Sequence, residues 1–212
     1  MRHQKLKQRA RQIEILSSLN KLEFASRRQL QAIHSLGSIR NANRVLKDLR
    51  QYCHVTSHDR EYVYYLNKKG LALLGLEPDE RKKKHQLEHI LLRNEAWMWL
   101  GFPDWKTEQV IQLRYQNEEK TIVPDAYYLV DQIPHFVEID RLQHMKTNEE
   151  KIKYYGLIAK LYKKQSNIVP NILFFTISDY REQKLESYGM KYNVYVRTFL
   201  LKDVLYKFRL MF

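Results

Sequence analysis

The sequence lacks the features that mark several large classes of protein. It has one cysteine, Cys53, which excludes an intramolecular disulfide and any zinc site built from several cysteines. No apolar run approaches the ~20 residues that a membrane span needs, and the basic N-terminus has no apolar secretory segment. The six glycines are scattered and form no phosphate-binding loop. These absences predict a cytoplasmic protein without a membrane partner.

Acidic residues are scarce in the first third of the chain. Residues 1–76 hold 15 lysines and arginines against 5 acidic residues, whereas residues 77–212 hold 22 against 19. Together with a net charge of +13, this asymmetry indicates a polyanionic partner, most often nucleic acid. A basic surface that only confers solubility is the alternative. A hydrophobic content of 44% is enough for real cores.

The basic third begins with helical patterns. Residues 6–19 place Ile13, Leu16 and Leu19 on one helical face. Ser26 is a suitable N-cap for a second helix, which ends before the turn residue Gly37.

A third helix is predicted over residues 38–53, and a hairpin follows it. Its predicted buried residues are Ile39, Val45, Leu46 and Leu49. Residues 54–66 alternate around a polar turn at 57–60, which is typical of two paired strands. Three helices followed by a hairpin are the order of a winged helix-turn-helix.

In a winged helix the third helix enters the major groove of DNA. Arginine suits guanine edges, asparagine suits adenine edges, and further cations contact phosphates. The candidate DNA-binding residues are Arg27, Arg40, Asn41, Asn43, Arg44 and Lys47, with His58 and Arg60 at the wing tip. The same residues could instead form a solvated face, and a winged helix can also dock proteins.

A charged segment with a proline, residues 77–86, predicts a linker between a first domain at 1–76 and a second at 87–212. In the second domain, a helical pattern at 85–101 precedes three strands at 105–116, 121–130 and 135–141. A long helix and another strand follow, and then a further helix and strand. This α-β-β-β-α-β order predicts an α+β fold with a mixed sheet covered by helices.

Carboxylates interrupt two of these strands. Asp125 follows a proline, and Glu138 and Asp140 lie two residues apart, so that they share one face of a strand. Such residues are retained in a core only when they are paired or bind metal. Salt bridges to Arg114 or Arg141 are the structural alternative to a metal site.

The spacing of these carboxylates carries a family resemblance. Pro124-Asp125 followed thirteen residues later by Glu138-x-Asp140, on adjacent strands of an αβββαβ unit, resembles the PD-(D/E)xK nuclease superfamily. With a winged helix ahead of it, the chain resembles the replication-relaxation family of plasmids and integrative elements. The motifs that carry this resemblance are Pro124-Asp125-Ala126, Glu138-Ile139-Asp140-Arg141 and Lys151-Ile152-Lys153-Tyr154-Tyr155.

The resemblance implies a DNA-binding protein that acts in replication or mobilisation and nicks or cleaves DNA with Mg²⁺ or Mn²⁺. Mg²⁺ prefers oxygen ligands, polarises a phosphoryl group and activates water. Asp125 and Glu138 are the expected ligands, and Asp140 is an auxiliary one. The implied partners are DNA, replication or mobilisation proteins and, through a winged helix, a second copy of the chain.

One position departs from the nuclease pattern, because Asp140 stands where the superfamily has a lysine. Lys151, on the following helix, is the first candidate to replace it, and Lys146 and Lys153 are others. Glu95 is a further acidic candidate. If no lysine replaces it, the protein is a non-catalytic DNA-binding accessory or regulatory factor.

A tyrosine nucleophile is disfavoured. Relaxases of that kind need two histidines flanking one hydrophobic residue, and the sequence has no such motif. Tyr154 and Tyr155 are therefore predicted to pack and to face DNA.

Overall fold

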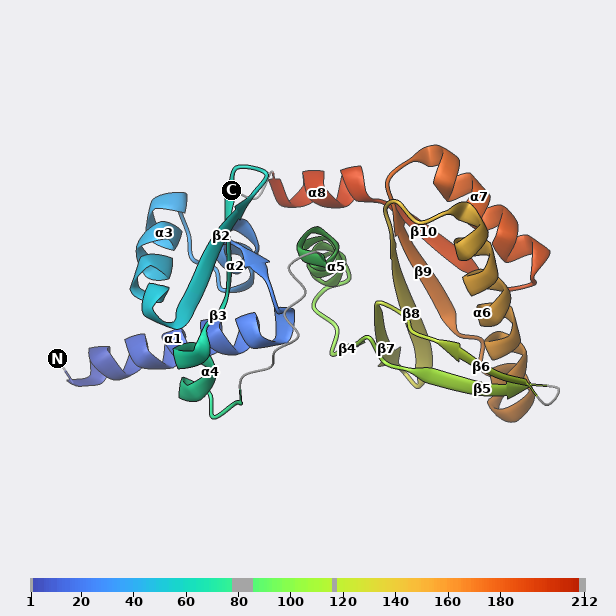
Figure 1. Cartoon of the computed structure of the whole chain (residues 1–212), viewed down its shortest axis with the longest axis horizontal. Helices are drawn as coiled ribbons and strands as arrows, with labels where there is room; N and C mark the ends of the chain where they lie inside the picture. Colours follow the sequence, from blue (N-terminus) through green and yellow to red (C-terminus); the bar gives the residue numbers. More distant parts are fainter. Residues whose placement is uncertain (1, 78–85, 116–117, 210–212) are drawn as a thin grey trace. The chain divides into compact units, whose positions relative to one another are not determined.

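The computed structural model describes residues 2–77, 86–115 and 118–209. The chain divides into two compact units, residues 1–98 with 208–212 and residues 99–207, whose elements are labelled in Figure 1. The predicted linker lies mostly outside the described residues. The helix after it, α5 (Leu87–Trp99), was predicted to open the second domain, but its residues up to Met98 group with the first unit. The reason is apolar contact, because Ile90 packs in one cluster with Phe24 and Tyr65.

The first unit contains the predicted three helices and hairpin. Its elements are α1 (Arg2–Leu22), β1 (Ala25–Ser26), α2 (Arg27–Ile33), α3 (Ile39–Asp48), the 3-10 turn η1 (Arg50–Tyr52), β2 (Cys53–His58), β3 (Glu61–Leu66), α4 (Lys68–Leu73) and α5. The three strands form an antiparallel sheet in the order β1-β3-β2.

Local signals in the sequence set the ends of these elements. Ser26 caps α2 as predicted, in a capping box with Gln29 in which each side chain bonds the other's backbone N–H. Gly37 turns the chain between α2 and α3 at φ +69°, a conformation that favours glycine. Asp59 and Arg60 both have positive φ at the tip of the β2–β3 hairpin, as two-residue hairpin turns require.

Two predicted core positions of the first unit are wrong. Ile13 is 39% exposed and Ile39 is 47% exposed. The apolar face of α1 instead begins at Ile15 and continues through Leu19 and Leu22, which are buried at helical spacing. The core therefore engages only the second half of α1.

The second unit is built around a mixed sheet. Its elements are β4 (Lys106–Thr107), β5 (Ile111–Tyr115), β6 (Glu118–Ile122), β7 (Ala126–Val130), β8 (Ile133–Asp140), α6 (Met145–Ser166), β9 (Asn171–Thr176), α7 (Asp179–Lys191), β10 (Val196–Leu200) and α8 (Leu201–Arg209). The sheet order is β10-β9-β8-β7-β4. Strands β8, β9 and β10 are parallel, whereas β7 is antiparallel to β8 and β4 to β7. The chain is thus a mixed α+β protein.

Two of the predicted strands are each divided in the structure. The strand predicted at 105–116 forms β4 and β5, and the strand predicted at 121–130 forms β6 and β7. Among the strands that the structure describes, β5 and β6 pair with each other and form a separate two-stranded sheet. Pro124 lies at the second break, since proline lacks the N–H that a ladder needs. Asp125 is consequently placed in a connection just before β7.

The core of the second unit lies between its sheet and two helices. Phe136 and Phe174 of the sheet pack with Tyr155 and Ile158 of α6 and with Leu185 of α7. One face of β8 is therefore turned towards α6, and polar residues on that face are enclosed. Among the described residues, no helix has the length and apolar character needed to cross a membrane.

Candidate functional site

Glu138 and Asp140 share the face of β8 that packs on α6. Phe136, two residues before Glu138, packs against Tyr155 of α6 with ring centroids 5.2 Å apart and the rings tilted by 36°. The alternation of a strand then directs Glu138 and Asp140 to the same side. They are 2% and 1% exposed, so both carboxylates need strong partners.

Glu138 takes its partners from one face of α6. Its Oε2 lies 2.6 Å from Nζ of Lys151, and its Oε1 accepts a 2.6 Å hydrogen bond from the hydroxyl of Tyr155. Lys151 and Tyr155 are four residues apart, which places both side chains on one side of a helix. Tyr155 was predicted to pack and to face DNA. It is indeed buried, but its hydroxyl binds the carboxylate.

Electrostatics at Glu138 favour an easily exchanged proton. Burial raises the pKa of Glu138 to about 7, and the nearby Asp125 carboxylate also raises it, whereas Lys151 and Tyr155 oppose the shift. Burial disfavours the charged form of Lys151, but the charges of Glu138 and Asp125 raise its pKa above the ordinary value. Two carboxylates and one ammonium group therefore share a small region.

Asp125 replaces a missing strand contact. Its Oδ2 accepts a 2.6 Å hydrogen bond from the backbone N–H of Ile139. The β7–β8 ladder ends at the pair Ala126–Val137. The side chain of Asp125 therefore supplies a hydrogen-bond acceptor to β8 just beyond the last residue of β7 that pairs through its backbone. The negative charge of Asp125 also raises the pKa of both Glu138 and Lys151. The structure thus pairs Glu138 with Lys151, while Asp125 binds the backbone of Ile139, the residue next to Glu138.

Asp140 is held in a separate arrangement. Arg181 of α7 grips both carboxylate oxygens, with Nε 2.7 Å from Oδ2 and Nη2 2.6 Å from Oδ1. Asn148 donates to Oδ1 at 2.7 Å, and Thr176 donates to Oδ2 at 2.8 Å. The expectation that Asp140 is an auxiliary metal ligand does not fit this geometry, because a guanidinium bound to both oxygens, an amide and a hydroxyl already occupy the carboxylate.

Among the described residues, no three histidine, cysteine or acidic side chains gather closely enough to hold a metal ion. The donor set at Glu138 still fits one Mg²⁺, which takes one or two protein carboxylates and completes its shell with water and phosphate oxygens. Asp125 and Glu138 would be these two ligands. Lys151 is the cation that currently neutralises Glu138.

The other acidic and basic candidates lie elsewhere. Lys146 and Lys153 are exposed, and only Lys151 of the three contacts Glu138. Glu95 belongs to the first unit, where Arg28 donates to it at 2.5 Å and Gln29 at 2.8 Å. Glu95 is therefore a structural carboxylate that joins α5 to α2.

The predicted DNA-binding residues of α3 divide into two groups. Arg40, Asn43 and Lys47 are exposed and follow one another at i, i+3 and i+7, which forms a single outward stripe. Asn41 is half-buried, and its amide donates to the carbonyl of Leu36 at 2.6 Å. Arg44 donates in turn to Asn41 at 2.8 Å.

The remaining predicted DNA-binding residues differ in availability. Arg27 bonds Gln31 at 2.5 Å and lies 3.1 Å from Glu61, so its guanidinium is engaged within the unit. Arg60 is exposed at the hairpin tip. His58 lies 3.7 Å from Asp59 at the same tip.

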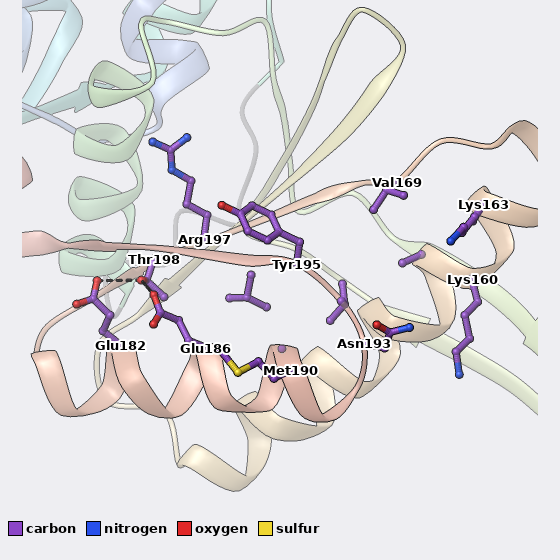
Figure 2. A pocket seen from close by; sticks show the side chains of 14 residues that line it. Lys160, Lys163, Val169, Glu182, Glu186, Met190, Asn193, Tyr195, Arg197 and Thr198 are labelled. Carbon is purple, nitrogen blue, oxygen red and sulfur yellow. Dashed lines mark hydrogen bonds between the residues drawn. The ribbon is translucent and has the colours of Figure 1, made fainter.

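Figure 2 shows a hollow of about 760 Å³ whose lining residues do not include Asp125, Glu138 or Asp140. It is bordered by the second half of α6, by one side of α7 and by β10, and neither Lys151 nor Tyr155 lines it. The hydroxyl of Thr198 lies 2.8 Å from a carboxylate oxygen of both Glu182 and Glu186 (Figure 2). Lysines 160 and 163 line the same hollow. With charges of both signs on its walls, the hollow does not indicate one class of ligand.

The residues that hold Asp140 were not among the predicted site residues. Arg181 lies 41 positions away and Thr176 lies 36 positions away. The register of β8 on β9 places Thr176 opposite Asp140, and no local pattern encodes that register. For Asn148, in the first turns of the helix after Asp140, proximity in sequence was the one available signal.

Comparisons with known proteins address the whole chain. Protein VC1899 from Vibrio cholerae is similar over 94% of this chain and 52% of its own, with 11% identity and a TM-score of 0.38. Restriction endonuclease FokI is similar over 93% of this chain and 43% of its own, with 15% identity and a TM-score of 0.32. The chain therefore spans about half of either protein, and likenesses this distant bear on neither mechanism nor partner. A comparison with curated proteins finds no match.

The sequence itself identifies the family. Residues 16–172 match the family described as replication-relaxation. This match includes the first unit from within α1, the carboxylates of β8 and the whole of α6. It covers well over half of the chain, and the chain belongs to the replication-relaxation family.

Proposed function

We propose that the protein binds DNA through its first unit and nicks or cleaves it at Asp125, Glu138 and Lys151 with Mg²⁺ or Mn²⁺. Membership of the replication-relaxation family indicates a role related to replication or mobilisation. The observation that carries the proposal is the lysine amine 2.6 Å from the buried carboxylate of Glu138, with the carboxylate of Asp125 bound to the backbone of the adjacent Ile139. This is the chemistry of a PD-(D/E)xK site with its lysine supplied by α6.

Each residue has a defined part in such a reaction. A bound Mg²⁺ would polarise the phosphoryl group and lower the pKa of an attacking water. Asp125 and Glu138 would hold the ion. Lys151, freed from Glu138, would donate to the negative charge that develops on the phosphate oxygens. Tyr155 would keep Glu138 oriented through its hydroxyl.

The proton at Glu138 sets the pH dependence of the proposed site. Since the pKa of Glu138 is raised to about 7, a sizeable fraction of the carboxyl is protonated at neutral pH. A cation must displace that proton, so metal affinity is expected to increase as the pH rises through about 7. Cleavage at fixed low Mg²⁺ should follow the same rise.

DNA binding is assigned to the exposed basic surface of the first unit. Arg40, Asn43 and Lys47 form the outward stripe of α3, and Arg60 lies at the tip of the hairpin. Arginine and asparagine match base edges, and lysine matches phosphates. The excess of cations in residues 1–76 supports the same partner.

A non-catalytic DNA-binding factor is the second candidate, and a specific feature favours it. Asp140, at the position of the superfamily's lysine, is gripped by Arg181, and both oxygens of Glu138 are engaged by Lys151 and Tyr155. A site closed in this way could serve only to hold the fold together. It predicts DNA binding that persists in chelator and no cleavage under any metal condition.

The two candidates differ in a test with supercoiled plasmid and Mg²⁺ or Mn²⁺. The nuclease proposal expects relaxed or linear product, lost in Asp125→Ala and Lys151→Ala and retained in Lys153→Ala. Lys153 is the matched control because it lies two residues away on α6 with an exposed side chain. If wild type and Asp125→Ala leave the plasmid equally intact while binding it, the non-catalytic factor is the better description.

A further inference from the structure

The first half of α1 has an unusual face. In the second half, Ile15, Leu19 and Leu22 enter the core of the first unit. The same face continues towards the N-terminus through Gln4, Lys7, Gln8, Arg11 and Gln12, at helical spacing. A helical face that packs against a core carries apolar residues at these positions. This part of the helix instead offers cations and amide donors.

This face borders a hollow shared with α3. The hollow has a volume of about 380 Å³, and α3 contributes Arg44, Val45 and Asp48 to it. Lys7 and Arg11 face it from α1, so three cations surround one carboxylate. Side chains of glutamine, lysine and arginine are all donors to phosphate oxygens. The composition of the walls thus fits an anion that accepts several hydrogen bonds.

The hollow divides α3 lengthwise. At about 100° per residue, Arg44 and Asp48 lie on the flank towards α1, whereas Arg40, Asn43 and Lys47 point outward. Arg44 is additionally oriented by its 2.8 Å bond to Asn41. The flank that faces α1 is therefore separate from the outward stripe, but it is adjacent to it on the same helix.

We propose that this hollow binds backbone phosphates of double-stranded DNA beside the segment that the outward stripe of α3 contacts. The proposal rests on DNA binding by the first unit and adds Lys7 and Arg11 to it. It also assigns Arg44 to phosphate rather than to a base edge. Phosphate contacts fix register without reading sequence, so α1 strengthens binding to all duplexes alike.

Charge removal with a matched control tests the proposal. The double variant Lys7→Gln/Arg11→Gln keeps good helix formers and removes two cations from the hollow. The control is Lys68→Gln/Lys69→Gln, which makes the same change on two exposed residues of α4. Affinity is measured for a random-sequence duplex at several salt concentrations, with thermal melting to verify that each variant folds.

The expected results have a defined form. Each phosphate contact contributes about 0.9 to the slope of log affinity against log salt. The α1 variant should therefore lose nearly two units of slope and bind several-fold more weakly, and the α4 control should match wild type. Asp48→Asn should bind more tightly than wild type, because it removes the one carboxylate that opposes phosphate.

Three outcomes would overturn the proposal. In the first, the α1 variant matches the α4 control while Arg40→Ala weakens duplex binding; DNA binding by α3 then stands and the role of the hollow falls. In the second, wild type itself fails to bind the duplex, and DNA binding falls with it. An α1 variant that loses affinity for inorganic polyphosphate but not for duplex would also overturn it.

Discussion

Two carboxylates of β8, two residues apart on one face, are held in opposite ways. Asp140 is gripped by the guanidinium fork of Arg181, with amide and hydroxyl donors completing its shell. Glu138 faces the amine of Lys151 and the hydroxyl of Tyr155, with Asp125 beside it. Guanidinium is always charged and has a fixed geometry, whereas an amine on a flexible stem can move. Asp140 is thus suited to hold the fold, and Glu138 to exchange its partner.

Glu95 in the first unit repeats the arrangement of Asp140. Arg28 and Gln29 of α2 bind it, and burial raises the pKa of Glu95 against their influence. Within the described part of the chain, Glu95 and Asp140 form their salt bridges with arginines and not with lysines. Glu95 and Asp140 are thus bound by arginines and join elements of the fold, whereas Glu138 is bound by a lysine.

The largest expected effect comes from removing the salt bridge between Arg181 and Asp140. Arg181→Ala leaves Asp140 charged and buried, and removing one member of a buried pair costs about 3–5 kcal/mol of the free energy of unfolding. Urea denaturation measures this loss, with the exposed Lys184→Ala on the same helix as control. Combining Arg181→Met with Asp140→Asn should recover part of it. A loss below about 1 kcal/mol would mean that Asp140 is not structural.

Removing the lysine should affect chemistry more than folding. Lys151→Ala takes away the donor to the developing charge, a change that typically lowers kcat by about 10²–10³-fold. Folding should suffer less than in Arg181→Ala, because Glu138 can take up a proton at its raised pKa of about 7. Plasmid cleavage and urea denaturation on the same preparation compare the two. Equal losses of stability in Lys151→Ala and Arg181→Ala would remove the distinction between the carboxylates.

The sequence predicted the parts of this comparison that depend on local pattern. Alternation in a strand placed Glu138 and Asp140 on one face, and the helix after them supplied Lys151 as the first candidate lysine. The capping box at Ser26 and the turn at Gly37 were equally local. In each of these cases the residues that interact are close in sequence.

Contacts between residues that are far apart in the sequence could not be predicted from local patterns. The partner of Asp140 is Arg181, and only the parallel pairing of β8 with β9 and the position of α7 bring the two together. Glu95 was a candidate for the acidic site, yet α5 packs on Phe24 and Tyr65 of the first unit. A strand pattern across Pro124 also concealed the break that places Asp125 in a connection. These errors share a cause: contacts between elements that are distant in the sequence decide where each element packs, and local patterns do not encode them.

A smaller effect should appear in the pH dependence of stability. The pKa of Glu138 is higher in the folded protein than in the unfolded chain, so the folded state holds more protons between about pH 4.5 and 7. Stability should therefore fall across this window as the pH rises, by at most about 1.4 kcal/mol per pH unit. Glu138→Gln lacks this titration. The free energy of unfolding of Glu138→Gln, relative to that of wild type, should therefore increase from about pH 4.5 to about pH 7 and stay constant outside that range.

Denaturation of both proteins at several pH values gives the measurement. Asp140→Asn, on the same strand, is the control. Arg181, the partner of Asp140, keeps its charge throughout this pH range. Parallel curves for wild type and Glu138→Gln would show that Glu138 is ionised across the window. Its lysine pair would then be as permanent as the arginine pair of Asp140.

The smallest expected effect concerns the hydroxyl of Tyr155. Tyr155→Phe keeps the ring that packs against Phe136 and removes only the donor to Glu138, at a cost of about 1 kcal/mol. Since that hydrogen bond lowers the pKa of Glu138, its loss should raise the pKa above about 7. The pH window of instability then extends upward, and metal binding needs a higher pH. Tyr154→Phe, next to it on α6, is the control, because the ring that lies over Lys120 is kept. An upward shift in Tyr155→Phe alone would mean that the hydroxyl keeps Glu138 ready to ionise, a role that no donor at Asp140 needs to perform beside a guanidinium.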